Sequence, residues 1–288
     1  MQSIEGPFGP AHLRETVSAA TIAAMYRAKC DAEVPFAAQG IDSLDLYECQ
    51  STGMRFWRPE ALAGDEAFYR QLSRKWPHYY QEWRWEYGPA LRQLRSGDRL
   101  LEVGCGRGTF LRQCEEHAAQ AEGLEYNREA IAGKVTRWPV RALDLSDLDA
   151  PEAFDVVCSF QVLEHVVDPA AFLHGCLASL RPGGRLIIST PDPENPGLAA
   201  RQDAFDLPPH HMNQFPLASY RRIAALLGLR ITRIDRAPFD PWGSRPPGTP
   251  RRDGLRTALR RGLRNLGARL RGQRGPTLMV TFVKRPAG

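Results

Sequence analysis

The sequence predicts an α/β fold, with a Rossmann-like sheet of parallel strands, helices on both faces and an N-terminal cap. From residue 98 onward, short apolar runs such as RLLEV and FDVVCSF alternate with helical patterns such as PAAFLHGCLASL. Strands that alternate with helices form right-handed βαβ units in a parallel sheet. The first of these runs enters a glycine-rich turn, which is typical of a ligand site at the carboxyl edge of such a sheet.

The elements of the predicted core follow in order over residues 98–239. After RLLEV come the helix TFLRQCEEH, the strand AEGLEY, the helix NREAIAGK, the strands VRALDL and AFDVVCSF, the helix PAAFLHGCLASL and the strand RLIISTP. The helix PLASYRRIAALLG and the strand LRITRI end this run. Residues 240–275 are expected to form a Pro/Arg-rich loop and a basic helix, and residues 276–288 contain a last strand, TLMVTFVK.

Residues 1–97 show a different pattern, which we interpret as a cap or lid. We expect a helix over residues 11–29, a short β-like patch over residues 44–58 and an aromatic-rich helix over residues 76–94. The aromatic side chains of this last helix are expected to lie in the core, with the mouth of a pocket as the alternative: Tyr79, Tyr80, Trp83 and Trp85.

Length and composition favour one large soluble domain with an appendage. The chain has 288 residues, of which 43% are hydrophobic, and this is enough to bury a sizeable core. No window approaches 18 consecutive apolar residues, and the start MQSIEGPFGP lacks the features of a secretory signal. We therefore expect a cytoplasmic protein whose six scattered cysteines are reduced thiols.

The positive charge of the chain is concentrated in one segment. The formal net charge is +5, and residues 245–274 carry ten arginines and one acid, Asp253. Subtracting this local +9 from +5 leaves −4 for the rest of the chain. Nucleic-acid binding is therefore not indicated as a property of the whole fold.

Within that segment, residues 254–271 have the pattern of a basic amphipathic helix. Leucines recur at steps of three or four, which places them on one side of a helix, and arginines cover the opposite side. The helix is expected either to pack its leucines on the domain or to order on an anionic membrane surface. Phosphates of a lipid-linked or nucleotide-linked acceptor are a further ligand for its arginines. The residues concerned are Leu255, Leu259, Leu263, Leu266 and Leu270 on one side, and Arg256, Arg260, Arg261, Arg264 and Arg271 on the other.

The segment LLEVGCGRGTFL at residues 100–111 predicts a cofactor site. Glycine lacks a Cβ and lets the backbone approach a ligand, and the following helix N-terminus offers free N–H groups. A dinucleotide-binding turn needs a third glycine at position 109, where this chain has Thr109, with its glycine at 108. The spacing therefore favours a ligand without a pyrophosphate.

Two acidic residues after the following strands extend this site. Glu125 ends the next strand about twenty residues beyond the first glycine, where a carboxylate can accept both hydroxyls of an adenosine ribose. Asp144, at the end of VRALDL, is placed to meet the adenine amino group, with a plain surface acid as the alternative.

Three ordered motifs within residues 98–191 carry a family resemblance: LLEVGCGRG, FDVVCSFQVLEHVVDP and LRPGGRLIISTP. They resemble the motifs of class I S-adenosylmethionine-dependent methyltransferases of the ubiquinone-biosynthesis type. The resemblance implies a seven-stranded sheet with an antiparallel last strand, and S-adenosylmethionine as the cofactor. It also implies cofactor contacts from Glu102, Gly104, Cys105, Gly106, Gly108, Glu125, Tyr126, Asp144, Leu145, Phe160 and Gln161.

Histidines in two loops are candidate bases. Methyl transfer from a sulfonium is an in-line displacement, so the protein aligns the nucleophile and, for a hydroxyl, removes its proton. His210 and His211 follow the fifth strand and His165 follows the fourth, with loop fixation or helix capping as the alternative role. Glu164, His165 and a second-loop histidine have the chemistry of metal ligands, but their spacing is not diagnostic and no metal is predicted.

The front segment resembles the zinc ribbon with which many relatives open. Where that ribbon has paired cysteines, this chain keeps the first of each pair, Cys30 and Cys49, with Glu33 and Thr52 at the second positions. A tetrahedral thiolate site is not expected, and we predict a zinc-free β patch.

The resemblance, with its ribbon-like front and the arginine-rich insert before the last strand, implies an enzyme that O-methylates a hydroxyl of a glycan, a lipid-linked molecule or a secondary metabolite. One alternative is a NAD or nucleotide-sugar enzyme, which Thr109 disfavours, and another is a catalytically inactive cofactor-binding scaffold. Nucleic-acid methylation is not favoured, because SFQVLEH lacks the Asn/Asp-Pro-Pro-aromatic turn of amino-methylating DNA enzymes. Peripheral contact with an anionic inner membrane through residues 254–271 is a further hypothesis.

Overall fold

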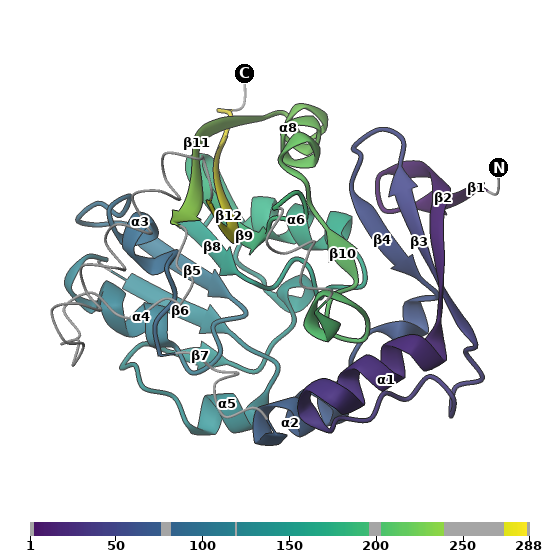
Figure 1. The fold of residues 1–288 in the computed structure, drawn as a ribbon. Helices are drawn as coiled ribbons and strands as arrows, with labels where there is room; N and C mark the ends of the chain where they lie inside the picture. Colours follow the sequence, from purple (N-terminus) through teal and green to yellow (C-terminus); the bar gives the residue numbers. More distant parts are fainter. Residues whose placement is uncertain (1–2, 76–81, 119, 196–202, 239–273, 287–288) are drawn as a thin grey trace, which may run out of the picture.

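A seven-stranded sheet forms the centre of the protein in a computed structural model (Figure 1). The structure describes residues 3–75, 82–118, 120–195, 203–238 and 274–286. The order of strands across the sheet is β11-β12-β9-β8-β5-β6-β7. Their bounds are β5 Arg99–Val103, β6 Gln120–Leu124, β7 Val140–Arg141, β8 Phe154–Phe160, β9 Leu180–Pro191, β11 Leu229–Pro238 and β12 Arg274–Lys284.

The pairing of the last strand confirms the predicted fold class. β5 pairs in parallel with β6 and β8, and β8 pairs in parallel with β9. β12 is antiparallel to both of its neighbours, β9 and β11. The carboxyl ends of the parallel strands therefore share one edge of the sheet.

Helices connect these strands, and several begin at the capping residues that the sequence supplies. The side chain of Asn127 accepts from the backbone N–H groups of Glu129 and Ala130, and that of Asp168 accepts from the N–H of Ala171. Such side-chain oxygens satisfy N–H groups that the first turn leaves without a partner. The helices of this part are α3 Tyr87–Leu91, α4 Thr109–Gln113, α5 Arg128–Ala132, α6 Pro169–Ser179 and α8 Leu217–Leu226.

A second sheet stands beside the first, in the order β1-β2-β3-β4-β10 (Figure 1). Four of its strands come from the N-terminal segment, and the predicted β patch is present as β3 and β4. The fifth strand, β10, belongs to the loop after β9 and pairs antiparallel with β4. The bounds are β1 Ser3–Gly6, β2 Gly9–Ser18, β3 Ser43–Cys49, β4 Arg55–Arg58 and β10 Asn213–Gln214.

The predicted helix over residues 11–29 is wrong in its first half. Residues 9–18 form strand β2, and the helix α1 spans Ala19–Cys30. Thr16 and Val17 are β-branched, and Val17 lies opposite Leu44 in the ladder that β2 forms with β3. Pairing with a neighbouring strand thus outweighs the local helix propensity of this stretch.

The predicted aromatic-rich helix is also wrong over most of its described part. Residues 82–86 are not helical, and α3 begins at Tyr87, so that Pro89 falls in its first turn, where its missing N–H is tolerated. Trp83 and Trp85 pack against a buried cluster around Phe110 and Phe160, as the core interpretation predicted. Tyr79 and Tyr80 lie outside the described residues. Another helix that the sequence did not indicate, α2, spans Glu66–Lys75.

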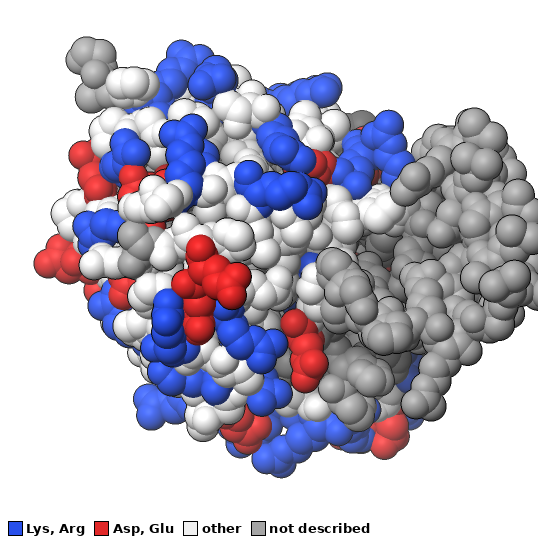
Figure 2. All heavy atoms as spheres, turned by 90° about the vertical axis from the view of Figure 1, so that its left-hand side faces the viewer, with Lys and Arg blue, Asp and Glu red and all other residues white. Residues whose placement is uncertain are grey.

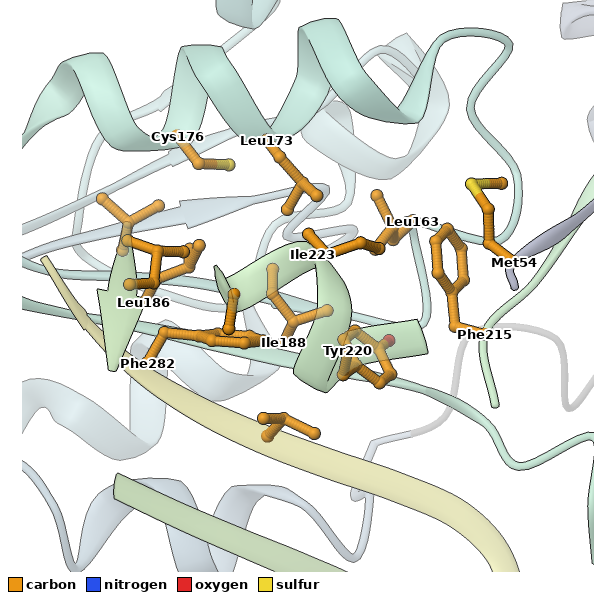
Figure 3. Packing of buried hydrophobic residues seen from close by; sticks show 14 of the residues in the cluster. Met54, Leu163, Leu173, Cys176, Leu186, Ile188, Phe215, Tyr220, Ile223 and Phe282 are labelled. Carbon is orange, nitrogen blue, oxygen red and sulfur yellow. The ribbon is translucent and has the colours of Figure 1, made fainter. Parts of the chain in front are cut away.

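The hydrophobic core continues from one sheet to the other. In Figure 3, Leu173 and Cys176 of α6 lie over the central sheet, and Met54 of the N-terminal segment lies beside Phe215. A further cluster joins Tyr26 and other residues of the N-terminal segment to Ala204 and Met212. Hydrophobic contacts and the pairing of β10 with β4 thus connect residues on both sides of the predicted domain boundary between residues 97 and 98. The boundary stays a prediction.

Charged side chains are spread over the described surface, with both signs interspersed in the view of Figure 2. The arginine-rich residues 245–273, with the predicted helix over 254–271, lie outside the described residues. All six cysteines are free thiols, and all except Cys30 are buried. Within the described residues, no helix has both the length and the apolarity to span a membrane.

Candidate active site

The glycine-rich turn links β5 to α4 in a backbone conformation that favours glycine. Gly104 and Gly106 have φ values of 74° and 56°, and L side chains rarely adopt this left-handed region. A Cβ on Gly104 would also lie 2.4 Å from a methyl carbon of Val162. The backbone conformation therefore favours glycine at both positions, and at Gly104 the close approach to the loop after β8 also excludes a larger side chain.

Glu125, at the end of β6, ties that strand to the turn. One oxygen of its carboxylate accepts from the N–H of Gly106 at 2.7 Å, and the other accepts from the N–H of Asn127 at 2.8 Å. Burial raises the pKa of Glu125, and the hydrogen bonds from backbone N–H groups oppose that shift. Each oxygen has a second lone pair with which to accept a ligand hydroxyl.

Asp144 lies at the start of the 3₁₀ turn Leu145–Asp147 and is held by neighbouring groups. It accepts from the N–H and the hydroxyl of Ser146, each at 2.6 Å, and from the hydroxyl of Tyr126. Although burial opposes it, the hydrogen bonds from Ser146 and Tyr126 lower the pKa of Asp144. The carboxylate is thus fixed at the carboxyl edge of the sheet, next to the end of β6.

The turn after β8 carries backbone strain. Gln161 has a φ of 56° although it is not glycine, and residues in this region cluster at functional sites. Its backbone N–H donates to the carbonyl of Ser189 at 2.9 Å, and its side-chain amide donates to Glu86 at 3.1 Å. Glu102, on β5, also lines the cavity, and burial raises its pKa.

These elements surround one cavity of about 780 Å³. Every residue that the family resemblance implies for the cofactor lies in its wall except Gly108, which caps α4 and fits closely against Thr136. The structure therefore brings together Glu102, Gly104, Cys105, Gly106, Glu125, Tyr126, Asp144, Leu145, Phe160 and Gln161.

The same cavity reaches a second group of residues, of which the sequence analysis had named only His165. Gly64, Asp65, Glu66 and Tyr69 come from the start of α2 and the turn before it, and His165 comes from the loop after β8. Since α2 was not predicted, no sequence signal assigned the first four of these to the site. Tyr69 contributes a hydroxyl 3.2 Å from Nδ1 of His165.

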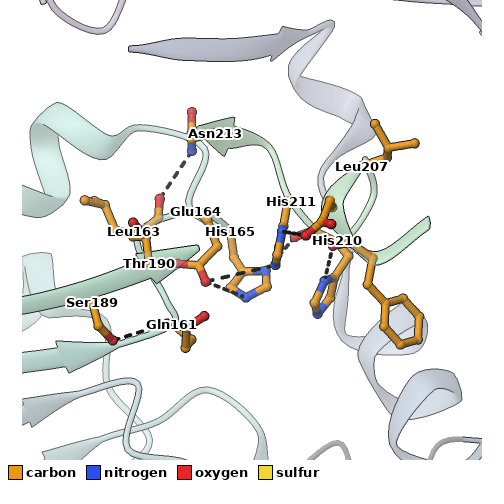
Figure 4. Close-up of polar contacts among 12 residues, drawn as sticks. Gln161, Leu163, Glu164, His165, Ser189, Thr190, Leu207, His210, His211 and Asn213 are labelled. Carbon is orange, nitrogen blue, oxygen red and sulfur yellow. Dashed lines mark hydrogen bonds and ion pairs between the residues drawn. The ribbon is translucent and has the colours of Figure 1, made fainter. Parts of the chain in front are cut away.

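The three candidate histidines lie together, and of these His165 lines the cavity. The ring centroid of His165 lies 4.5 Å from that of His210 and 4.9 Å from that of His211. Figure 4 shows the rings of His165 and His211 beside the carboxylate of Glu164. His210 and His211 are buried and do not line the cavity.

The N-terminal sheet holds this histidine segment in place. The N–H of Trp57 on β4 donates to the carbonyl of Met212 at 2.9 Å, and the N–H of Gly64 donates to the carbonyl of Pro209. The side-chain amide of Asn213 donates to the carbonyl of Val166 at 2.7 Å, which joins the two loops. The cap therefore acts as part of the frame for the histidines.

Burial dominates the electrostatics of this cluster. Desolvation raises the pKa of Glu164 to about 8, while Arg84 in the cavity wall acts in the opposite direction. Desolvation lowers the pKa of His165 and His210 well below the usual value and that of His211 to about 3. All three imidazoles are therefore neutral near pH 7.

The cysteines of the ribbon-like segment pack in different places. Cys30 ends α1 and packs beside the cluster of Tyr26, whereas Cys49 ends β3 and belongs to the central cluster. Thr52 is buried, and its hydroxyl accepts weakly from the N–H of Met54 at 3.4 Å. The zinc-free character of this segment stays a prediction.

Comparison with known proteins gives the family of the chain. A methyltransferase-domain family matches residues 69–234, which is more than half of the sequence. The chain belongs to this family. It is a class I S-adenosylmethionine-dependent methyltransferase, as the three motifs predicted, with S-adenosylmethionine as its cofactor.

Two relatives illustrate the similarity. The methyltransferase is 39% identical over 101 residues to a probable S-adenosylmethionine-dependent methyltransferase of Mycolicibacterium smegmatis, which covers 34% of this chain and 39% of that protein. It is 29% identical over 170 residues to a ubiquinone biosynthesis O-methyltransferase of Xanthomonas euvesicatoria, which covers 52% of this chain and 70% of that protein. The first match thus spans well under half of the relative's length.

Solved structures share the fold of the methyltransferase. A chain from the complex between the Haloferax volcanii Trm112 methyltransferase activator and a methyltransferase has a TM-score of 0.57 at 20% identity, covering 77% of this chain and 97% of that one. An S-adenosylmethionine-dependent methyltransferase from Mesorhizobium loti has a TM-score of 0.50 at 21% identity, covering 68% and 96%. At these identities the likeness concerns the fold alone.

Proposed function

We propose that this methyltransferase O-methylates a hydroxyl group that enters the cavity at the end formed by Tyr69 and His165. The observation that carries the proposal is the continuity of one cavity from the carboxylates of Glu125 and Asp144 to that end. A cofactor bound over the glycine turn and an acceptor beside His165 would then share one enclosed space, which in-line transfer requires.

The residues at the glycine turn fit S-adenosylmethionine chemically. Glu125 offers carboxylate oxygens for two ribose hydroxyls, and Asp144 offers a fixed acceptor for the adenine amino group. The close backbone turn at Gly104 and Gly106 leaves room for the amino-acid portion. When bound, this cofactor supplies an electrophilic methyl group on a sulfonium.

The residues at the opposite end fit a hydroxyl acceptor. His165 is neutral and its Nδ1 donates to the carbonyl of His210, so Nε2 carries the lone pair. Nε2 receives the proton as the acceptor oxygen forms its bond to the methyl carbon. The carbon–sulfur bond breaks with its electron pair left on sulfur. His210 and His211 support the position of His165 and are not proposed to touch the acceptor.

We propose a glycan, a lipid-linked molecule or a secondary metabolite as the acceptor class. The ubiquinone biosynthesis O-methyltransferases among the relatives support oxygen as the acceptor atom. Pro238 and Arg274 pair at the carboxyl edge of the sheet, so the arginine-rich segment leaves and rejoins the fold at the edge that bears the cavity. Arginines attached there favour an acceptor that carries phosphate.

Methyl incorporation from labelled S-adenosylmethionine into fractionated cell extract tests this proposal. We expect label in a small-molecule, glycan or lipid fraction as a methyl ether, which survives mild base that cleaves methyl esters. The Glu125→Ala variant serves as the control for cofactor-dependent labelling. A product methylated on nitrogen or carbon would overturn the assignment.

A further inference from the structure

We propose that Glu164, His165, His210 and His211 form a binding site for a first-row divalent transition metal, such as Zn²⁺, at the acceptor end of the cavity. This differs from the expectation drawn from the sequence, in which the spacing of these residues gave no reason to predict a metal. The evidence for the site is the arrangement of these four side chains. Its use in catalysis rests on the O-methylation proposed above.

The potential ligand atoms lie close enough together to share one ion. One ligand atom from each of the three histidines lies within 4.8 Å of the others. Oε1 of Glu164 lies 3.9 Å from Nε2 of His165 and 4.0 Å from Nε2 of His211 (Figure 4). Zinc bonds of about 2.0 to 2.1 Å place tetrahedral ligand atoms about 3.4 Å apart. A contraction of about half an ångström, by side-chain rotation, would therefore close these two pairs around an ion.

Each imidazole is oriented by an acceptor at its Nδ1 atom. Nδ1 of His165 donates to the carbonyl of His210, and Nδ1 of His210 donates to the carbonyl of Phe205 at 2.8 Å. Nδ1 of His211 lies 3.6 Å from a carboxylate oxygen of Asp206. Metal-bound histidines characteristically use their second nitrogen in this way, toward a carbonyl or a carboxylate. The arrangement leaves Nε2 as the atom with a lone pair for a metal.

The side chain of Glu164 supplies an observation that is independent of the histidines. Its side chain is 1% exposed, and neither oxygen has a hydrogen-bond partner among the described residues. A buried polar group without a partner costs about 1 to 3 kcal/mol, and more when it is charged. Nε2 of His165 and Nε2 of His211 lie 3.9 and 4.0 Å from Oε1 of this carboxylate, beyond hydrogen-bond distance but on either side of a space that all three atoms face. A divalent cation between these groups would satisfy the carboxylate and use the lone pairs together.

The ligand set favours a transition metal over Mg²⁺. Imidazole nitrogens suit zinc, iron, cobalt and nickel, whereas Mg²⁺ prefers oxygen ligands and retains several waters. Three imidazoles and one carboxylate give a nitrogen-rich, compact site. Because His165 also lines the cavity, an open coordination position there would face the acceptor.

The ion would act as a Lewis acid on the acceptor hydroxyl. Binding of the hydroxyl oxygen to the metal lowers the pKa of the hydroxyl, so its proton leaves to solvent water. The oxygen then attacks the methyl carbon and the carbon–sulfur bond breaks, with no change in the oxidation state of the metal. In this form of the protein His165 is a ligand and not the base.

Titration of chelator-treated full-length protein with Co²⁺ tests the site without any acceptor. We expect one Co²⁺ per chain, visible ligand-field absorption, and displacement by Zn²⁺ but not by excess Mg²⁺. The His165→Ala and His211→Ala variants should each bind the metal at least about 100-fold more weakly, and Asp206→Asn about tenfold more weakly. His174→Ala, an exposed histidine on α6, should bind as the unaltered protein does.

The affinity for S-adenosylhomocysteine serves as the folding control, because the glycine turn is separate from the histidines. If an alanine variant loses that affinity as well, His165→Gln and His211→Asn provide replacements of closer size. The inference is overturned if the unaltered protein binds Co²⁺ no more tightly than the double variant of His165 and His211. Metal binding without methyl-ether formation would instead refute the proposed function and leave the metal site in place.

Discussion

The two ends of the cavity are built in different ways. The cofactor end is centred on one short run of sequence, in which β5, the glycine turn, α4 and Glu125 fall within residues 99–125, and Asp144 and Gln161 join it from the ends of later strands. The acceptor end combines Tyr69 of α2, His165 of the loop after β8, and the segment around His210, which β4 holds in place through β10. The first end is thus local in sequence and the second is assembled over long distances.

This difference has a functional consequence. A local site depends on backbone geometry that neighbouring residues set, so it can persist while the rest of the chain changes. An assembled site depends on how the N-terminal sheet docks on the core, since Trp57 and Gly64 hold the histidine segment. We therefore expect substitutions at the two ends to have separable effects on cofactor binding and on methyl transfer.

The largest effect on methyl transfer is expected from His165→Ala. Loss of a group that removes a proton or holds a metal lowers the rate by about 10²- to 10⁴-fold. The affinity for S-adenosylmethionine should stay within about twofold, because His165 lies at the other end of the cavity from Glu125. Initial rates and calorimetry measure the two quantities. Equal losses in both would show that the ends do not act separately.

A smaller effect is expected from Glu125→Ala, and it should appear in the affinity for S-adenosylmethionine and not first in the rate of methyl transfer. Loss of charge-assisted hydrogen bonds worth about 1.5 to 3 kcal/mol should weaken S-adenosylmethionine binding by about tenfold or more. Glu129→Ala is the matched control, since Glu129 is an exposed acid on the neighbouring helix that pairs with Arg74. Calorimetry that finds unchanged affinity for Glu125→Ala would refute the ribose assignment, whatever the histidine variants do.

The same difference explains what could be predicted from the sequence. The glycine turn and Glu125 could be predicted because the strand, the turn, the helix and the next strand follow one another directly along the chain. The role of Tyr69 was not, because α2 carries no motif and reaches His165 only after the chain has folded. The strand β2 was mistaken for a helix because its register with β3 is a long-range property that residues 11–18 do not encode alone.

His210 and His211 show most clearly what could not be predicted from the sequence. The sequence placed His210 and His211 near the carboxyl edge, but it could not show that both would be buried and that His211 would face Glu164. That orientation depends on the carbonyl of Phe205, the carboxylate of Asp206 and the pairing of β10 with β4. Spacing within one segment contains none of these contacts.

A moderate effect is expected when the link between the two loops is removed. Asn213→Ala removes the donor to the part-buried carbonyl of Val166, which should lower the free energy of unfolding by about 1 to 3 kcal/mol. Asn195→Ala removes comparable bonds to the carbonyls of Arg274 and Gly275, each of 2.9 Å, away from the histidines.

Comparing these two variants separates positioning from stability. Both should show the stability loss in denaturant titrations, but only Asn213→Ala should lower kcat, by about tenfold, which corresponds to about 1.4 kcal/mol in the transition state. The KM for S-adenosylmethionine should be unchanged in both. If Asn195→Ala lowers kcat as much as Asn213→Ala does, the effect on the histidine end reflects general destabilisation.

The smallest effect on either end is expected from the arginine-rich segment. Replacing Arg256, Arg260, Arg261 and Arg264 by glutamine should leave S-adenosylmethionine affinity unchanged, because the segment is attached at Pro238 and Arg274, at the β11–β12 side of the sheet, whereas the glycine turn follows β5. Cations near an anionic leaflet contribute about 1 kcal/mol each, so the four replacements should abolish salt-sensitive sedimentation with vesicles that contain anionic lipid. Wild-type protein that stays in the supernatant at low salt would reject membrane contact. The five leucines of residues 254–271 would then be assigned to packing on the domain.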